Sequence, residues 1–186
     1  PLISVSDNTH GTIKHLSSKN EKDATRSNLN EFYDGSISFE PEKEDFHLKK
    51  DGYFFSGNNV SSGVKALSVM DILSRGGYLN TESLIILDEP ETNLHPKWQK
   101  KYAEAIVKLS QKGVRILVNT HSPYMLESLK AYSGFFKSSA KFYFSHKVRD
   151  EVSLIDTHGD ISIIIDALSG PLRDLMLKMQ GEPDDF

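Results

Sequence analysis

The stretch Leu84-Ile85-Ile86-Leu87-Asp88-Glu89-Pro90-Glu91 decides the fold. An apolar run with β-branched residues leads into two adjacent carboxylates, and a proline ends it. Such a run predicts a buried strand of a parallel sheet. That strand would deliver Asp88 and Glu89 to the edge of the sheet where open α/β folds bind their ligands. Paired acids there suggest magnesium, a phosphate chain and an activated water, whereas the simpler alternative is two solvated acids.

A helix is predicted directly after this strand. Pro96 suits its first position, and Gly113 suits its end. Apolar residues recur on one helical face, at Trp98, Tyr102, Ile106 and Leu109. For Trp98 we favour packing in a core or an interface over stacking on a nucleotide.

A second buried strand is predicted over residues 114–118, and the polar residues Asn119, Thr120 and His121 follow it. Ser122 can cap the next helix, and Pro123 can start it. A right-handed β-α-β crossover makes the two strands parallel. Asp88, Glu89 and His121 are therefore expected to converge at one edge of the sheet.

Small polar residues and a glycine precede another helical pattern at residues 58–65. Ser61 or Ser62 is a natural N-cap. Gly63 in the first turn allows close approach of the backbone, and the free N–H groups there can bind an anion. Capping alone is the simpler alternative.

The remaining segments fit an α/β domain. Residues 1–31 are polar and show no clear period, residues 32–55 predict an antiparallel meander, and residues 141–155 predict a hairpin. Two helices are expected near the C-terminus, over 161–168 and 172–179, because Gly170-Pro171 interrupts the pattern. Residues 181–186 are acidic and predict a frayed tail.

Composition indicates a globular protein. The chain has 186 residues and a formal net charge of -4, which leaves no global basic surface for nucleic acid. It has no cysteine, which fits an intracellular, cytoplasmic protein. No apolar run approaches the roughly 18 residues of a membrane span. The chain begins with Pro1 rather than Met, so we expect a fragment or a processed chain.

Phosphoryl transfer to water needs a metal clamp, an oriented water and a group that senses the terminal phosphate. A strand-end Asp such as Asp88 can hold magnesium, usually through water. The following carboxylate, Glu89, can polarise the attacking water. A histidine on the next strand, His121, can donate to the γ-phosphate.

Residues 60–125 resemble the core of ABC-type ATPases, in the branch shared by structural-maintenance-of-chromosomes (SMC), RecF-like and OLD-like proteins, and in particular small bacterial AAA_21-like proteins. The 84–89 strand resembles the Walker B strand, with Asp88 as its metal-side acid and Glu89 as its catalytic base. His121 matches the switch histidine. The resemblance implies a P-loop NTPase-like fold with a mainly parallel sheet flanked by helices, and ATP and Mg²⁺ as cofactors.

Two further segments carry this resemblance. Residues 60–65 are similar to the signature loop, in which Ser61, Ser62 and Gly63 would contact the γ-phosphate of ATP held by the other subunit. Serine stands where the usual pattern has its first glycine. Residues 93–96, beginning with Asn93, resemble the D-loop that lies across the dimer interface. The resemblance thus implies an ATP-dependent homodimer, with DNA or an effector protein as a further partner.

One element of the family pattern is absent. The sequence contains no Gly-x-x-x-x-Gly-Lys-[Ser/Thr], which is the phosphate-binding loop called Walker A. We therefore expect residues 1–186 to be one ATPase domain fragment with its core at 32–180, the C-terminal part of a larger ATPase. Such a fragment is expected to bind ATP poorly and not to hydrolyse it alone.

Three other interpretations stay open at this point. The chain could be a degenerate module that dimerises without hydrolysis, which the missing loop favours. It could be an AAA+ ATPase with Asn119 as its sensor residue. It could also be a metal-dependent nuclease that uses Asp88, Glu89 and Glu91.

Overall fold

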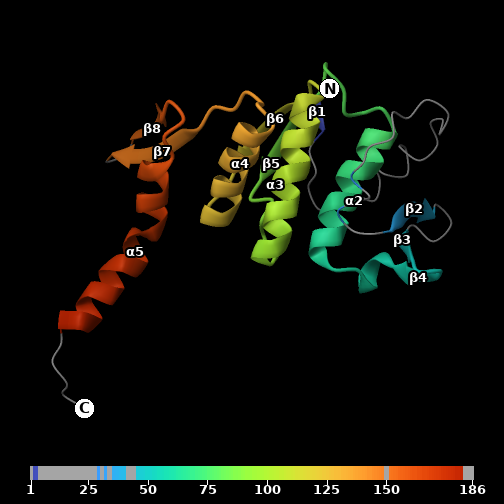
Figure 1. The fold of residues 1–186 in the computed structure, drawn as a ribbon, viewed down its shortest axis with the longest axis horizontal. Helices are drawn as coiled ribbons and strands as arrows, with labels where there is room; N and C mark the ends of the chain where they lie inside the picture. Colours follow the sequence, from blue (N-terminus) through green and yellow to red (C-terminus); the bar gives the residue numbers. More distant parts are fainter. Residues whose placement is uncertain are drawn as a thin grey trace, which may run out of the picture.

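The computed structural model describes residues 2–3, 29, 32, 35–40, 45–148 and 151–181. These residues form an α/β fold, as predicted (Figure 1). Its elements, in chain order, are β1 (Leu2–Ile3), β2 (Ser36–Glu40), β3 (Asp45–Lys50), β4 (Tyr53–Ser56), η2 (Gly57–Asn59), α2 (Ser62–Arg75), β5 (Leu84–Asp88), α3 (Pro96–Gln111), β6 (Arg115–Asn119), α4 (Pro123–Phe135), β7 (Tyr143–Val148), β8 (Glu151–Asp156) and α5 (Ser162–Gly181).

The central sheet has the strand order β1-β5-β6, and both strand pairs are parallel. The predicted β-α-β unit is therefore confirmed, with α3 as the connection between β5 and β6. In the register of this pair, Ile85 lies opposite Ile116 and Asp88 lies opposite Asn119. The carboxyl ends of the two strands consequently meet at the same edge.

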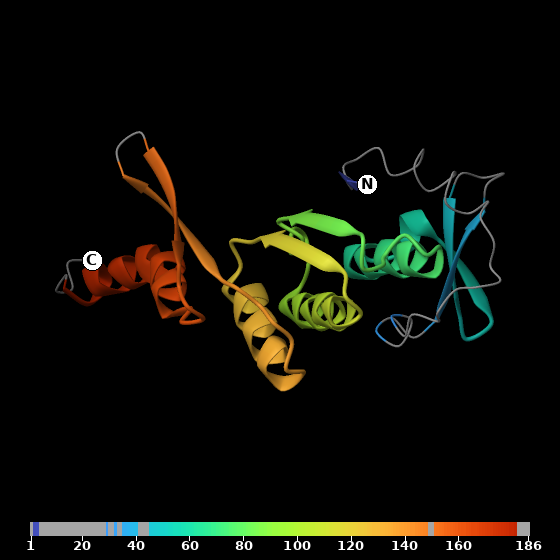
Figure 2. The same cartoon turned by 90° about the horizontal axis from the view of Figure 1, so that it is seen from above.

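Helices α3 and α4 lie side by side on one face of β5 and β6 (Figure 2). Side chains alternate along β5, so that Ile85 and Leu87 are buried while Leu84 and Ile86 are exposed. Leu117 of β6 is also exposed. The prediction of a buried strand therefore holds for one face of β5 in the described part of the chain, because helices cover only that face there.

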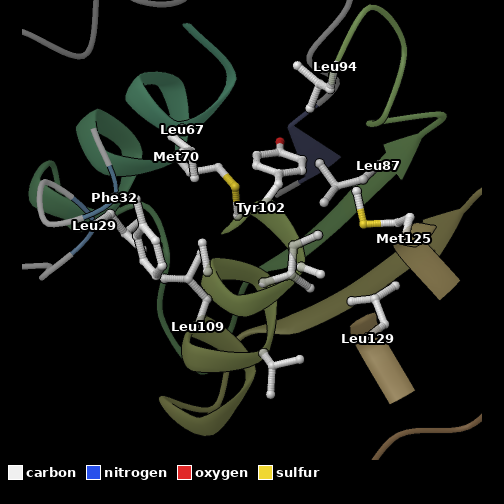
Figure 3. Close-up of a cluster of buried hydrophobic side chains, with 14 of the residues drawn as sticks. Leu29, Phe32, Leu67, Met70, Leu87, Leu94, Tyr102, Leu109, Met125 and Leu129 are labelled. Carbon is white, nitrogen blue, oxygen red and sulfur yellow. The ribbon is translucent and has the colours of Figure 1, made fainter. Parts of the chain in front are cut away.

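The core lies between α2, α3, α4 and the covered face of the sheet. Leu67, Leu109 and Met125 are fully buried. Figure 3 shows Tyr102 in the middle, with Met70 on one side and Leu87 on the other. Burial raises the pKa of the Tyr102 phenol. Each fully buried aliphatic side chain contributes about 1.5–3 kcal/mol, so α2, α3 and α4 each stabilise the core through one such residue.

The predicted meander is confirmed as an antiparallel sheet of order β2-β3-β4. Asp51 and Gly52 form the turn between β3 and β4, and both have positive φ, as tight hairpin turns require. Arg75 of α2 donates to the carbonyl of Ile37 at 2.8 Å, and its guanidinium lies 2.9 Å from the carboxylate of Asp71. The meander is thereby tied to α2.

At the other end of the molecule, β7 and β8 form the predicted antiparallel hairpin (Figure 1). The predicted break at Gly170-Pro171 is wrong, because α5 runs through both residues. Proline removes one helical hydrogen bond but has a φ compatible with the helix. Ile164 is buried, and Ile165 and Leu168 pack against the core, so the first half of α5 is anchored before Pro171.

The polar N-terminal segment contributes more than predicted. Leu2 and Ile3 extend the central sheet, and Leu29 and Phe32 are buried in the core. The other residues of 1–31 lie outside the described residues. Gly181 ends α5, and the predicted tail at 182–186 also lies outside the described part. Of the helices that are described, none has the length and apolar character needed to cross a bilayer.

Candidate functional site

The acidic end of β5 is held by Asn119 at the end of β6. The side-chain amide of Asn119 donates to Oδ1 of Asp88 at 2.7 Å. The backbone N–H of Glu89 donates to the carbonyl of Asn119 at 2.9 Å. Parallel pairing therefore continues to the point where the two acids leave the sheet, and Asn119 orients the first of them.

Glu89 leaves the strand in an unusual backbone conformation. Its φ is 43°, in the left-handed region that non-glycine residues seldom adopt. The turn brings Oε1 of Glu89 to 3.4 Å from Nε2 of His121. Both side chains are largely exposed, at 51% for Glu89 and 70% for His121, so their pairing adds little stability. The structure thus brings Asp88, Glu89 and His121 to one edge, as the topology predicted.

Glu91 holds the 120–122 loop. Its Oε1 accepts hydrogen bonds from Oγ1 of Thr120 at 2.7 Å, from N–H of His121 at 2.8 Å and from N–H of Ser122 at 3.1 Å. Its Oε2 is buried without a hydrogen-bond partner. Because this carboxylate binds the 120–122 loop, it does not join Asp88 and Glu89 as the nuclease hypothesis requires. Within the described residues, no group of three or more His, Cys, Asp or Glu side chains could hold a metal ion.

The 92–95 loop contacts the start of α2. Asn93 has a φ of 61°, and its carbonyl accepts a hydrogen bond from Oγ of Ser62 at 2.7 Å. The buried Leu94 follows it. His95 caps α3, since its Nδ1 accepts from N–H of Lys97 at 3.2 Å. This cap was not predicted, although a polar residue directly before Pro96 is a recognisable signal.

The first turn of α2 differs in one detail from the prediction. Ser61 occupies the N-cap position, but its side chain makes no capping hydrogen bond, and Ser62 bonds to the 92–95 loop instead. Ser61 and Ser62 are exposed, while Gly63 is buried. A Cβ at position 63 would lie 2.6 Å from the Trp98 ring. The glycine is therefore required by Trp98, which packs against the core as predicted.

The fold is shared with known ATPase heads. A solved chain from work described as "Structural biochemistry of ATP-driven dimerization and DNA stimulated activation of SMC ATPases" matches with a TM-score of 0.54 and 13% identity, over 95% of this chain and 98% of that one. The SMC head domain from Thermotoga maritima matches with a TM-score of 0.53 and 16% identity, over 80% of this chain and 52% of that one. An SMC head bound to the C-winged helix domain of ScpA matches with a TM-score of 0.54 and 14% identity, over 84% and 51%. The class is thus the P-loop NTPase fold of SMC-type heads.

The sequence assigns the family within that class. Residues 3–127 match the family model AAA_21, described as "AAA domain, putative AbiEii toxin, Type IV TA system", and the chain belongs to this family. The Old nuclease of Escherichia phage P2 is 30% identical over 105 residues, which are 54% of this chain and 18% of that protein. The chain therefore spans less than a fifth of that relative. Fold and family agree with the resemblance to SMC and OLD-like ATPase domains.

The side chains at the sheet edge fit part of a magnesium–nucleotide site. Magnesium prefers carboxylate and water oxygens and is usually held by one or two carboxylates. Asp88 is exposed and oriented by Asn119, which suits that role. The phosphate-binding motif Gly-x-x-x-x-Gly-Lys-[Ser/Thr] is not among the 186 residues.

Proposed function

We propose that this chain supplies one part of the ATP hydrolysis site of an ABC-type ATPase. The observation that carries the proposal is the 3.4 Å approach of Glu89 and His121 at the carboxyl edge of a parallel sheet, beside the oriented carboxylate of Asp88. Membership of an AAA family and the SMC-type fold support it. A phosphate-binding loop from outside these 186 residues would complete the site.

Each of the three residues has a distinct role in this proposal. Asp88 would hold Mg²⁺ through water, and the bound metal would neutralise charge on the phosphates. Glu89 accepts the proton of the attacking water as general base. His121 donates a hydrogen bond to the γ-phosphate, and its imidazole lies 3.4 Å from the Glu89 carboxylate.

In this proposal, the start of α2 and the 92–95 loop contact a second copy of the protein. Ser61 and Ser62 are exposed beside Gly63 at the N-terminus of α2, where backbone N–H groups favour an anion. Ser62 also joins this terminus to Asn93. Facing the γ-phosphate of ATP in the partner, these residues would make dimerisation depend on ATP. The description of one solved neighbour names ATP-driven dimerisation and stimulation by DNA, which makes DNA a candidate partner here, with an effector protein as the other.

A module that dimerises without hydrolysis is the alternative function. The observation that favours it is the absence of the phosphate-binding motif from the 186 residues. The oriented Asp88 and the pairing of Glu89 with His121 favour hydrolysis, because a degenerate module has no use for them.

The test compares ATP hydrolysis by wild type and Glu89→Gln in the protein that joins this chain to a phosphate-binding loop. Loss of a general base lowers kcat by about 10²–10⁴-fold. Glu127→Gln, an exposed glutamate of α4, is the matched control and should leave kcat unchanged. Hydrolysis that survives Glu89→Gln would contradict the assigned role. ATP turnover by the isolated 186-residue chain, abolished by Glu89→Gln, would contradict the need for a further loop.

A further inference from the structure

A buried side-chain amide joins two loops of the site. Nε2 of Gln99, in the first turn of α3, donates to the carbonyl of Leu94 at 2.9 Å. Oε1 of the same amide accepts from Oγ of Ser122 at 2.5 Å. Gln99 is 8% exposed and Ser122 is 9% exposed. One amide group therefore spans the gap between the 92–95 loop and the 120–122 loop, with little access for water.

Each of these loops also carries a residue of the site. In the 92–95 loop, the carbonyl of Asn93 accepts from Ser62 at the start of α2. In the 120–122 loop, His121 directly precedes Ser122, and N–H of both residues bonds to Glu91. Hydrogen bonds thus join Ser62 to Asn93, Leu94 to Gln99, and Gln99 to the hydroxyl of Ser122. The peptide bonds Asn93–Leu94 and His121–Ser122 complete the path to His121.

The amide of Gln99 cannot exchange its partners easily. A buried amide that loses a hydrogen bond has no water to replace the partner. Rotating the amide by half a turn would set its oxygen against the carbonyl of Leu94 and leave its NH₂ group facing Ser122. A displacement of one loop therefore favours a matching displacement of the other.

Packing at the same turn of α3 reinforces this connection. Trp98, the neighbour of Gln99, lies against Gly63 so closely that a Cβ there would approach its ring to 2.6 Å. The first turn of α3 thus contacts the first turn of α2 through Trp98 and the 120–122 loop through Gln99. Both contacts lie on one rigid helix.

We propose that Gln99 is a positioning residue that couples the 92–95 loop and Ser62 to the placement of His121 opposite Glu89. A contact made at Asn93 or Ser62 would thereby alter the geometry of the hydrolytic residues of the same chain. The proposal rests on the proposed function for the statement that His121 acts in hydrolysis. The coupling itself is a property of the folded chain without nucleotide.

The test is NMR spectroscopy of the 186-residue chain, with no nucleotide added. The signals followed are the imidazole ring of His121 and the backbone N–H of Ser122. Ser62→Ala removes the bond to Asn93 and perturbs the 92–95 loop. In the wild-type background we expect Ser62→Ala to shift both signals by more than a linewidth. In the Gln99→Met background, where the side chain has similar length but no amide, the same substitution should shift them by less than a linewidth.

Gln111→Met is the matched control. Gln111 lies on the same helix, and its Nε2 donates to the carbonyl of Phe136 at 2.8 Å, away from the two loops. The response to Ser62→Ala should persist in this background. If Gln99 had only a structural role, Gln99→Met would shift the His121 signals. Ser62→Ala would then shift them equally with and without Gln99.

Equal responses in the wild-type and Gln99→Met backgrounds, or no response in wild type, would overturn the proposal. If the Gln99→Met chain does not fold, Ser122→Ala cuts the same connection from the other side, and the response of the His121 ring signal must then be lost. The NMR test involves no nucleotide, so the two experiments can fail separately. If the NMR response depends on Gln99 but hydrolysis survives Glu89→Gln, only the proposed function is refuted. If the NMR response does not depend on Gln99 but Glu89→Gln abolishes hydrolysis, only the role of Gln99 is refuted.

Discussion

The imidazole of His121 lies 3.4 Å from the carboxylate of Glu89, although helix α3 and strand β6 separate the two residues in the chain. The pair forms because β5 and β6 are parallel and in a register that sets Asp88 opposite Asn119. Glu91 then fixes the loop that carries His121. The predictions below test the features that hold this arrangement and its surroundings.

Removing the carboxylate of Glu91 should loosen the 120–122 loop. Glu91→Ala leaves the donors of Thr120, His121 and Ser122 without their acceptor, and we expect a loss of about 1–3 kcal/mol in the free energy of unfolding. Glu91→Gln keeps an acceptor oxygen and should lose less. Urea unfolding measures both changes. Glu127→Ala on the exposed side of α4 is the control, and equal losses at the two positions would argue against the hydrogen bonds.

Adding a methyl group at Gly63 should force Trp98 to move. Gly63→Ala sets a Cβ against the Trp98 ring, and overpacking of this kind costs about 1–3 kcal/mol. Gly134→Ala in α4 has open space and should stabilise the chain by up to about 1 kcal/mol. Thermal unfolding compares the two variants. Tryptophan fluorescence should change only in Gly63→Ala, and an unchanged spectrum there would mean that the ring does not contact position 63.

The start of α5 should respond to acid. The backbone N–H of Ser162 donates to Oδ1 of Asp160 at 2.9 Å, and this hydrogen bonding lowers the pKa of the Asp160 carboxyl. A depressed pKa in the folded chain stabilises it above the pKa of the unfolded chain, and the effect is lost as pH falls through the folded pKa. The N–H signal of Ser162 should therefore shift as Asp160 is protonated. In Asp160→Asn that titration should vanish, and its persistence would assign it to another group.

Replacing Pro171 should strengthen the second half of α5. Proline inside a helix costs about 3 kcal/mol relative to alanine, and Pro171→Ala restores the missing N–H donor. We expect the amide protons of residues 172–178 to exchange with solvent more slowly. Lys178→Ala, later in the same helix, is the control. Unchanged exchange in Pro171→Ala would mean that the proline does not limit the stability of this segment.

The central unit could be predicted from the sequence because its signals are local. The apolar run before Asp88 indicates a strand. Pro96 marks the start of α3, and Gly113 follows its end. Parallel pairing follows from the length of the connection. Together with the apolar strand predicted at 114–118, these signals were enough to expect Asp88, Glu89 and His121 at one edge.

Other features depend on tertiary contacts that the sequence does not display. Leu2 and Ile3 form a strand because β5 offers them a free edge, and nothing in their neighbourhood shows a strand period. Gly63 is glycine because of Trp98, which lies 35 residues further along the numbering. The amide of Gln99 acts between two loops that only the fold brings together.

The left-handed backbone of Glu89 has a consequence for protein engineering. Such a conformation costs a non-glycine residue about 1–3 kcal/mol, and asparagine tolerates it better than glutamate does. A screen that selects only for heat resistance should therefore enrich Glu89→Asn or Glu89→Gly and discard the carboxylate that faces His121. Engineering a more stable version of this domain should therefore leave Glu89 unchanged. Stability should instead be increased at sites such as Pro171 and Gly134.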